Sequence, residues 1–311
     1  MKGGIEMSRF ESVVLGGGAA GLSAALTLGR GRREVLMVDN GRQSNLAATT
    51  VGGLPGHEGG TPAEYYATAR AELTAFPTVE LRDGEIAAAR RAEDGFTVVL
   101  ADGPEVHART LILAPGVDYD YPRLPGLEDR WGNAVFHCPF CHGWEVRDRP
   151  LAVLAAGEVG VHGALNLRGW SDRITLLTNG DDSLTDDHRK ILADGGVTLD
   201  ERPVAKVTGT GPQLQAVHFA DGGEIPAEGL LVKSILRQRS TLARDLGATV
   251  LEPDEHLSVE AIQVDRMGAT GMPGLFAAGD AATSVPPSLS SALASGYLVG
   301  AAAVVGLNTG R

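Results

Sequence analysis

The first apolar run of the chain is followed by a glycine-rich turn and an alanine-rich stretch. Residues 11–15, Glu-Ser-Val-Val-Leu, form the run, and residues 16–21, Gly-Gly-Gly-Ala-Ala-Gly, form the turn. Small and leucine side chains continue to about Leu28, and a second apolar run covers residues 34–38. This order predicts a buried strand, a tight turn, a helix and a second strand parallel to the first.

The same order of apolar run, turn and helix returns in the second half of the chain. Residues 151–154, Leu-Ala-Val-Leu, precede the turn 155–160, and an alanine- and leucine-rich stretch continues to about Gly169. Another strand is expected at residues 174–177. Two units of this kind predict an α/β fold with two Rossmann-like domains.

Proline and glycine clusters mark two breaks between these units. A strand is expected to end in the turn at residues 110–116, and the segment Pro-Arg-Leu-Pro-Gly at residues 122–126 follows it. A similar break comes near residues 251–254. We therefore expect a discontinuous first domain, residues 1–123 and 252–311, and a second domain, residues 124–251, inserted into it.

The C-terminal segment is expected to complete the first domain. Residues 274–280, Gly-Leu-Phe-Ala-Ala-Gly-Asp, predict another short buried strand that ends in Gly-Asp. Pro286, Pro287 and Ser288 then precede a helix from about Leu289 to Val305, because proline and serine are favoured where helices begin.

The first glycine turn has the pattern expected of a dinucleotide site. Gly16 permits the tight turn, Gly18 lets a pyrophosphate approach the backbone, and Gly21 lets helix and strand pack closely. Asp39 ends the next strand, at the distance along the chain expected for an acid that binds a ribose. A glycine turn without a ligand is the alternative, but the strand, helix and distal acid in register favour the site.

The second turn has a weaker signature. Superposing the two turns brings Thr178 to the position of Asp39, so the ribose-binding acid is missing. The residues that follow, 179–182, include two aspartates and no arginine or lysine to bind a 2′-phosphate. The alternative to a nicotinamide site is therefore a Rossmann-like scaffold without one.

Composition limits the classes of function. The chain has 311 residues, and 27 Lys and Arg against 39 Asp and Glu give a net charge of −12. No basic run is present, so we expect no nucleic-acid partner. Uninterrupted apolar stretches such as 301–307 are shorter than the ~20 residues of a membrane-crossing helix. Glu6 and Glu11 precede a run interrupted by glycine, which is unlike a signal peptide, so we expect a cytoplasmic protein without membrane contact.

The two cysteines, Cys138 and Cys141, form the motif His-Cys-Pro-Phe-Cys-His. A Cys-x-x-Cys pair near a helix start can form a reversible disulfide. Zinc is the alternative, with His137 and His142 as further ligands, but residues adjacent to each cysteine cannot readily point into one tetrahedron. We therefore predict a redox dithiol and no metal; inert buried cysteines are the other alternative.

The ordered set of motifs resembles the low-molecular-weight thioredoxin reductases, which are FAD-dependent pyridine nucleotide-disulfide oxidoreductases. The motifs that carry this resemblance are Gly16-x-Gly18-x-x-Gly21 with Asp39, Ala114-Pro-Gly116, Cys138-x-x-Cys141 and Phe276-Ala-Ala-Gly-Asp280. The resemblance implies two three-layer ββα domains, with FAD in the first and the Cys-x-x-Cys in the inserted NAD(P)-type domain. It also implies a homodimer.

The resemblance further assigns roles to individual residues. Asp39 would bind the adenosine ribose, and Asp280 would lie near the ribityl chain and pyrophosphate. Cys141 would be the thiol next to the flavin, with the disulfide stacked on the isoalloxazine ring, and Cys138 would exchange with substrate. The residues expected to contact FAD are Gly16, Gly18, Ala19, Ala20, Gly21, Asp39, Asn40, Ser44, Asn45, Ala114, Gly116, Gly279, Asp280, Ser290 and Ser291.

Two departures from that family point to a different electron flow. The second turn begins Ala155-Ala156, and the residues after Leu177 lack the family's basic cluster, so use of NAD(P)H is doubtful. His142 follows the second cysteine where the reductases commonly have aspartate. A Cys-x-x-Cys followed by histidine resembles the FAD-dependent dithiol oxidases, and His142, with His137 as a second candidate, would move protons during thiol exchange.

Three functions follow from these observations. The first is oxidation of a small-molecule dithiol to a disulfide through Cys138, Cys141 and FAD, with oxygen as electron acceptor. The second is reduction of a thioredoxin-like protein by NAD(P)H or ferredoxin. The third is a flavin-bearing redox sensor without enzymatic turnover.

Overall fold

The computed structural model describes residues 7–253, 259–282 and 287–310. Asp254, at the end of the second expected break, and Pro286 lie outside these residues. Contacts divide the chain into two compact units, each described separately below. The first unit comprises Met1–Leu46, Ala63–Asp118 and Leu236–Arg311, and the second comprises Ala47–Pro62 and Tyr119–Ile235.

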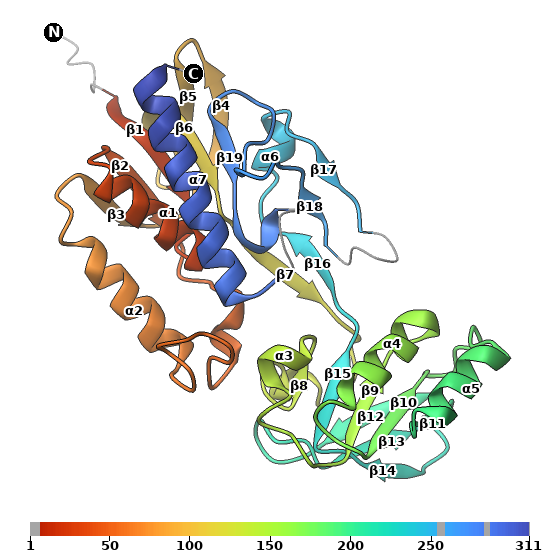
Figure 1. The fold of residues 1–311 in the computed structure, drawn as a ribbon. Coiled ribbons are helices and arrows are strands. Elements are labelled where there is room, and N and C mark those ends of the chain that lie inside the picture. Colours follow the sequence, from red (N-terminus) through yellow and green to blue (C-terminus); the bar gives the residue numbers. More distant parts are fainter. Residues whose placement is uncertain (1–6, 254–258, 283–286, 311) are drawn as a thin grey trace, which may run out of the picture. The chain divides into compact units, whose positions relative to one another are not determined.

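The first unit is built on a seven-stranded sheet (Figure 1). Its strands are β1 (Ser8–Leu15), β2 (Val35–Asp39), β3 (Val79–Asp83), β4 (Ile86–Ala92), β5 (Gly95–Leu100), β6 (Glu105–Leu113) and β19 (Leu275–Ala277). The order is β3-β2-β1-β6-β5-β4, and β19 pairs with β6. Strands β3, β2, β1, β6 and β19 are parallel to their neighbours, whereas β4 and β5 form an antiparallel hairpin next to β6.

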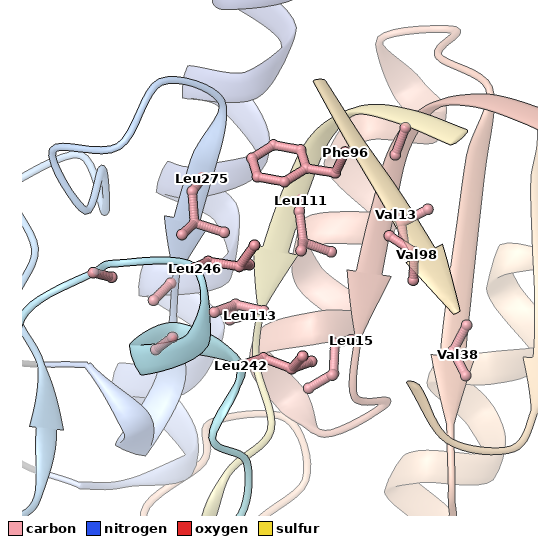
Figure 2. Close-up of a cluster of buried hydrophobic side chains, with 14 of the residues drawn as sticks. Val13, Leu15, Val38, Phe96, Val98, Leu111, Leu113, Leu242, Leu246 and Leu275 are labelled. Carbon is pink, nitrogen blue, oxygen red and sulfur yellow. The ribbon is translucent and has the colours of Figure 1, made fainter. Parts of the chain in front are cut away.

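Two apolar clusters cover the faces of this sheet. Helices α1 (Ala19–Arg30), α2 (Pro62–Leu73) and α7 (Leu289–Thr309) bury one face with residues such as Leu28 and Leu73. On the other face, Phe96 and Val98 of β5 pack with Val13, Leu111 and the short helix α6 (Leu242–Asp245) (Figure 2). The helices α1, α2 and α7, the parallel strands and the β4–β5 hairpin form the three layers that were expected. The elements β17 (Val250–Leu251), β18 (Ala261–Ile262) and the 3₁₀ turns η1 (Ser44–Ala47) and η3 (Gly279–Ala281) complete the unit.

Helix α7 packs along α1 through small residues. A Cβ placed on Gly296 would lie 2.1 Å from the Ala20 carbonyl oxygen, and one placed on Gly300 would lie 2.8 Å from the Thr27 side chain. By length and composition alone, this 21-residue helix could cross a membrane. The helix was expected at about residues 289–305, but a segment able to cross a membrane was not, because serine and glycine interrupt its apolar run. A third of its most apolar window is buried within the protein.

The second unit contains a parallel sheet of order β11-β10-β9-β15-β8. Its strands are β8 (Val135–Phe136), β9 (Leu151–Leu154), β10 (Ile174–Leu177), β11 (Thr198–Asp200) and β15 (Gly229–Val232). Helices α4 (Gly157–Leu167) and α5 (Asp186–Asp194) pack on one face, and the antiparallel strands β12 (Val204–Thr208), β13 (Ala216–Phe219) and β14 (Glu224–Pro226) pack on the other. The unit also holds η2 (Glu128–Arg130) and α3 (Pro139–His142). The predicted fold, two three-layer ββα domains, is confirmed.

The chain passes between the units in β7 (Val117–Asp120) and β16 (Ile235–Gln238), which pair with each other. The expected limits of the inserted domain, residues 124 and 251, lie further along the chain than these strands. The contact-based units also differ from the expected domains in taking residues 47–62 into the second unit. The domain limits themselves stay a prediction.

Candidate functional site

The carboxyl ends of four parallel strands meet at one edge of the first unit. Leu15 of β1 is in register with Val38 of β2 and with Leu113 of β6, and Ala277 of β19 is also in register with Leu113. The residues that follow these strands therefore lie together, as they do where open α/β sheets bind ligands. The edge brings together the expected cofactor residues Gly16, Asp39, Ala114, Gly116, Gly279 and Asp280.

The glycine turn between β1 and α1 has the close approaches that its sequence predicts. Gly16 has a φ of +96°, and a Cβ on it would lie 2.1 Å from the Ala114 carbonyl oxygen. A Cβ on Gly21 would lie 1.8 Å from the Gly16 carbonyl oxygen. In contrast, no atom lies within 4 Å of the Cβ position of Gly18, so the backbone there faces open space.

Asp39 holds this turn in place. Its buried carboxylate accepts hydrogen bonds from the Gly17 backbone N–H at 3.0 Å and the Gly41 N–H at 3.2 Å. The Gln43 side chain also donates to it, and Arg70 forms an ion pair with it at 2.8 Å. Asp39 therefore fixes the conformation of the turn. The hydroxyls of a bound ribose would donate to a carboxylate that already accepts these hydrogen bonds.

Asp280 provides a second carboxyl at the same edge. Burial raises its pKa to about 6, and nearby Arg239 opposes this increase. Gly279, with a φ of +75°, turns the chain into η3, and its N–H donates to the Ser295 hydroxyl. A weakly acidic, buried carboxyl suits a polyhydroxyl chain, which can both donate to and accept from it.

The remaining expected cofactor residues belong to the same unit but have mostly structural partners. Ser44 donates to the Val117 carbonyl at 2.8 Å, and Asn45 accepts from Tyr66 at 2.7 Å. Asn40 donates to Glu85. The backbone N–H of Ser291 donates to the Ser288 hydroxyl at the start of α7. The other residues of the set are Ala19 and Ala20 in the first turn of α1 and Ser290 in the first turn of α7.

These observations fit FAD as the group held at this edge. The first turn of α1 carries no acidic side chain, Gly18 is open to a pyrophosphate, and Asp39 lies where a ribose is expected. Several residues that no motif indicated also support the site: Gln43, Tyr66, Arg70, Arg239 and Ser295. Gln43 lies only four residues after Asp39 but belongs to no recognised pattern, and the other four reach the edge from distant parts of the chain.

Two backbone contacts of the first turn recur in the second unit, although Gly157 has a φ of +56° where Gly18 has −73°. The N–H of Ala155 donates to the Leu177 carbonyl at 3.2 Å, as the N–H of Gly16 donates to the Val38 carbonyl at 2.8 Å. A Cβ on Gly160 would lie 2.7 Å from the Ala155 carbonyl oxygen, which corresponds to the contact of Gly21. The internal repeat inferred from the sequence is therefore present in the backbone contacts of the two turns.

The surroundings of the second turn differ from those of the first. The Ser183 hydroxyl lies 3.2 Å from the Cβ position of Gly157, the position equivalent to the open Gly18. Ser183 in turn donates to Asp181, and Glu158 lies in the first turn of α4. Thr178, at the position of Asp39, is buried, and its hydroxyl has no partner among the residues the structure describes. Acidic side chains here repel a phosphate group.

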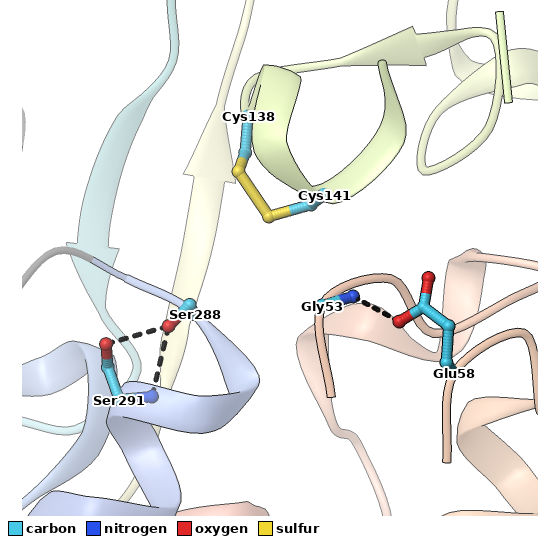
Figure 3. Close-up of a disulfide and its surroundings, with 6 residues drawn as sticks. All are labelled: Gly53, Glu58, Cys138, Cys141, Ser288 and Ser291. Carbon is cyan, nitrogen blue, oxygen red and sulfur yellow. Dashed lines mark hydrogen bonds between the residues drawn. A yellow bond between two sulfur atoms is a disulfide. The ribbon is translucent and has the colours of Figure 1, made fainter. Parts of the chain in front are cut away.

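Cys138 and Cys141 form a disulfide around the single-turn helix α3 (Figure 3). Cys138 is the residue before the helix, and the two Cα atoms are 5.4 Å apart. The segment 47–62 packs against this helix, because a Cβ on Gly52 would lie 2.4 Å from the Cys141 carbonyl oxygen. Glu58 closes that segment by accepting a hydrogen bond from the Gly53 N–H at 2.7 Å.

The two histidines beside the disulfide are held uncharged. His142 stacks on Phe136 at 5.7 Å, and burial lowers its pKa. Its Nδ1 is buried and has no hydrogen-bond partner in the described part of the chain. His137 lies between Tyr119 and Trp131, with its ring centroid 4.5 Å and 6.0 Å from theirs. Burial, and to a lesser extent the nearby His142, lowers the pKa of His137 to about 4. At neutral pH both rings can accept a proton.

The low pKa of His137 predicts that acid destabilises the oxidised protein. Between about pH 6.5 and 4 the unfolded chain binds a proton at this residue and the folded chain does not, so stability falls as the pH decreases through this range. The difference is ~2 kcal/mol at pH 5. We expect urea unfolding at about pH 7.5 and pH 5 to show this loss in the wild type and a smaller loss in His137→Phe.

The control for this experiment is His162→Phe, at an exposed position on α4. This variant should lose as much stability on acidification as the wild type. Equal losses in wild type and His137→Phe would contradict the assignment of a depressed pKa to His137.

Comparisons with known proteins agree with this architecture. Residues 10–296 match the family described as pyridine nucleotide-disulphide oxidoreductase. The thioredoxin reductase tcpT of Claviceps purpurea is 32% identical, over 93% of this chain and 92% of its own length. An oxidoreductase from Agrobacterium tumefaciens has a similar structure, with a TM-score of 0.90, 35% identity and coverage of 97% of this chain and 100% of its own. The structure of HlmI is also similar, with a TM-score of 0.86, 32% identity and coverage of 100% and 95%.

Proposed function

Because the chain belongs to the pyridine nucleotide-disulphide oxidoreductase family and is a thioredoxin reductase-like disulfide oxidoreductase, we propose that it oxidises a small-molecule dithiol to a disulfide. Cys138 and Cys141 exchange with the substrate, FAD collects the electrons, and oxygen is the final acceptor. The protein would act in the cytoplasm.

The observation that carries this proposal is the contrast between the two glycine turns. The first turn presents open backbone at Gly18 and an anchored carboxylate at Asp39. At the second turn, Ser183 lies over Gly157, and Glu158 and Asp181 add negative charge. A nicotinamide dinucleotide carries a pyrophosphate that needs the N–H groups of this turn. The residues of the second turn do not fit it, and a dithiol is then the natural electron donor.

The proposed exchange proceeds in two thiol–disulfide steps. A substrate thiolate attacks the sulfur of Cys138, which breaks the Cys138–Cys141 bond and releases the Cys141 thiolate. The second substrate thiolate attacks the mixed disulfide, so the substrate leaves as a disulfide and Cys138 leaves as a thiolate. The turn at residues 16–21, with Asp39 and Asp280, would hold FAD, which would supply a two-electron acceptor for the Cys138–Cys141 dithiol and a donor that reduces oxygen to hydrogen peroxide.

His142 and His137 would manage the protons of these steps. Because burial keeps both rings uncharged, each can accept the proton of an incoming substrate thiol. His142 directly follows Cys141, and its unpartnered Nδ1 can take up a proton without breaking another hydrogen bond. His137 precedes Cys138, the cysteine assigned to exchange with substrate.

The direct test is anaerobic reduction of the purified flavoprotein in three separate cuvettes, with NADPH, NADH and dithiothreitol. We expect dithiothreitol to bleach the visible flavin absorption within seconds and both nicotinamides to act at least ~100-fold more slowly. Admission of air should restore the colour and form hydrogen peroxide. Rapid bleaching by either nicotinamide, followed by reduction of a thioredoxin, would sink the oxidase proposal.

The names of curated relatives favour a second candidate function. Several of them are named thioredoxin reductases, and the backbone of the second turn retains Rossmann geometry. In this alternative, NADH or a protein donor such as ferredoxin reduces the flavin, and Cys138 reduces a thioredoxin-like protein. The same anaerobic reductions, with reduced ferredoxin as a fourth electron donor, distinguish the two directions of electron flow.

A homodimer is part of the proposal, and the outer face of α7 supports it. Tyr297 is 59% exposed and Val305 is 61% exposed, and Leu298 and Ala294 lie on the same side of the helix. Large apolar side chains gathered on one exposed face are typical of interfaces between protein chains.

The exposed apolar face of α7 predicts that a charged side chain placed on it weakens the dimer. Tyr297→Glu would bury a carboxylate at the interface, so we expect the dimer to dissociate at least ~100-fold more readily. Light scattering coupled to size exclusion measures the mass. The matched control, Ile191→Glu on the exposed side of α5, should remain a dimer. A wild type that is monomeric at micromolar concentration would remove homodimerisation from the proposal.

A further inference from the structure

A cavity of about 590 Å³ lies within the second unit, beside the redox helix. Of its wall, the dithiol chemistry described above uses only His142. Its volume falls in the range of sites that bind small molecules. Five segments build the wall, and the residues that matter for recognition are Thr49, Thr50, His142, Glu145, Gln213 and Gln215.

Part of the wall is fixed by hydrogen bonds before any ligand binds. The backbone N–H and hydroxyl of Thr49 donate to Asn133 at 3.1 and 2.8 Å, and Asn133 donates to the Ala47 carbonyl. Arg149 pairs with Glu228 at 3.0 Å across another part of the wall. The cavity is therefore preorganised, which lowers the entropic cost of binding.

Other polar groups of the wall remain available. Among the residues the structure describes, the side chains of Thr50, Gln213 and Gln215 have no protein partner. Two carboxamides and a hydroxyl offer donors and acceptors that match amide or hydroxyl groups. Arg149 is neutralised by Glu228, so Glu145 leaves the wall with excess negative charge, which disfavours an anionic ligand.

Two connections link this cavity to the disulfide. His142 lies in the wall and directly follows Cys141 in helix α3. The segment that supplies Thr49 and Thr50 also places Gly52 against the Cys141 carbonyl. The cavity wall therefore includes one residue of the redox helix and part of the segment that packs against that helix.

We propose that this cavity is the specificity pocket for the dithiol substrate, and that it selects uncharged molecules that carry amide or hydroxyl groups. This inference rests on the proposed function. Gln213 and Gln215 would bind the body of the substrate, and Glu145 would exclude acidic thiols. The thiol groups undergo the exchange already described, so the pocket adds selection and no new chemical step.

The test compares three dithiols on the full flavoprotein at low ionic strength. The first is an N-acetylated, C-amidated peptide of sequence cysteine-glycine-glycine-cysteine, the second has two aspartates in place of the glycines, and the third is 1,4-butanedithiol, which has neither amide nor hydroxyl. We expect kcat/KM for the neutral peptide to exceed that for the acidic one about 5-fold. Gln215→Leu should raise KM for the neutral peptide about 3- to 10-fold and have a much smaller effect on KM for butanedithiol.

Matched variants separate the pocket from the general surface. Glu145→Gln should reduce the discrimination against the acidic peptide, whereas Asp172→Asn, an exposed position of the same unit, should not. Gln263→Leu, an exposed glutamine of the first unit, should leave KM for both peptides unchanged. Binding of S-methylated peptides, which cannot exchange, is measured by calorimetry and should weaken in Gln215→Leu by the same factor as KM rises.

Two results would contradict the proposal that this cavity is a specificity pocket. The first is an unchanged affinity for both peptides in Gln215→Leu and Glu145→Gln. The second is a loss of butanedithiol oxidation as large as that of the peptide in these variants, which would mean that they damage the redox helix. Failure of the wild type to oxidise dithiothreitol is a separate result that rejects the proposed function, and calorimetry with the S-methylated peptides then still decides whether the pocket binds them.

Discussion

Cys141→Ser should lower dithiol oxidation by at least ~1,000-fold, because a serine hydroxyl cannot form the disulfide that the substrate attacks. Cys138→Ser should cause a loss of the same size. Peroxide formation with dithiothreitol measures the rate. Flavin content and far-ultraviolet circular dichroism should match the wild type in both variants, since both cysteines belong to the second unit and the expected FAD residues belong to the first.

The two cysteine variants differ in what they can trap. If Cys138 is the thiol that exchanges with substrate, Cys141→Ser holds a monothiol as a mixed disulfide on Cys138, because neither the protein nor the bound monothiol then offers a second thiol to displace it. Mass spectrometry of the protein incubated with the disulfide of a monothiol, glutathione disulfide, should find this adduct in Cys141→Ser and little of it in Cys138→Ser. The reverse pattern would exchange the two roles, and turnover by either variant at the wild-type rate would contradict the mechanism.

The second large effect is expected at Gly18. No other described part of the chain lies within 4 Å of the Cβ position of Gly18, and its φ of −73° is allowed for any residue. Gly18→Ala should therefore fold with nearly unchanged stability. The added methyl would, however, occupy the space through which a pyrophosphate approaches the turn. We expect FAD affinity to fall ~30-fold or more, measured by titration of the apoprotein with FAD and by flavin content after purification.

Gly21 is the matched control in the same turn. A Cβ there would lie 1.8 Å from the Gly16 carbonyl oxygen, so Gly21→Ala must separate β1 from α1. This variant should lose ~3 kcal/mol or more of unfolding free energy as well as the cofactor. If Gly18→Ala bound FAD as tightly as the wild type, the turn would not be the pyrophosphate site.

Several features of the protein follow from local sequence. The strands at 151–154 and 174–177 lie where their apolar runs predicted them, because short β-branched and leucine runs bounded by turns have few alternatives in an α/β chain. The glycine turn at residues 16–21 was equally predictable, since its spacing is required by close backbone approaches. Helix α7 was also expected, at about residues 289–305, and it continues to Thr309. That it is long and apolar enough to cross a membrane was not expected, because serine and glycine at a helix–helix contact interrupt the apolar run.

The candidate site was predictable only in part. Motifs identified Asp39 and the Cys-x-x-Cys pair, because each depends on residues near one another in the chain. They did not indicate that Arg70 would hold Asp39, or that Ser183 would lie over Gly157. These contacts join segments separated along the chain, and only the packing of helices and loops determines which side chains meet.

The sequence alone thus determined the class of the protein, its repeated Rossmann units and its redox motif, since hydrophobic periodicity and short-range spacing encode these features. The tertiary structure decided which turn is open and which is covered, how burial keeps His137 and His142 uncharged, and where a cavity forms beside the redox helix. Those properties depend on solvent exclusion and on contacts between segments distant in the chain, and no local pattern specifies either.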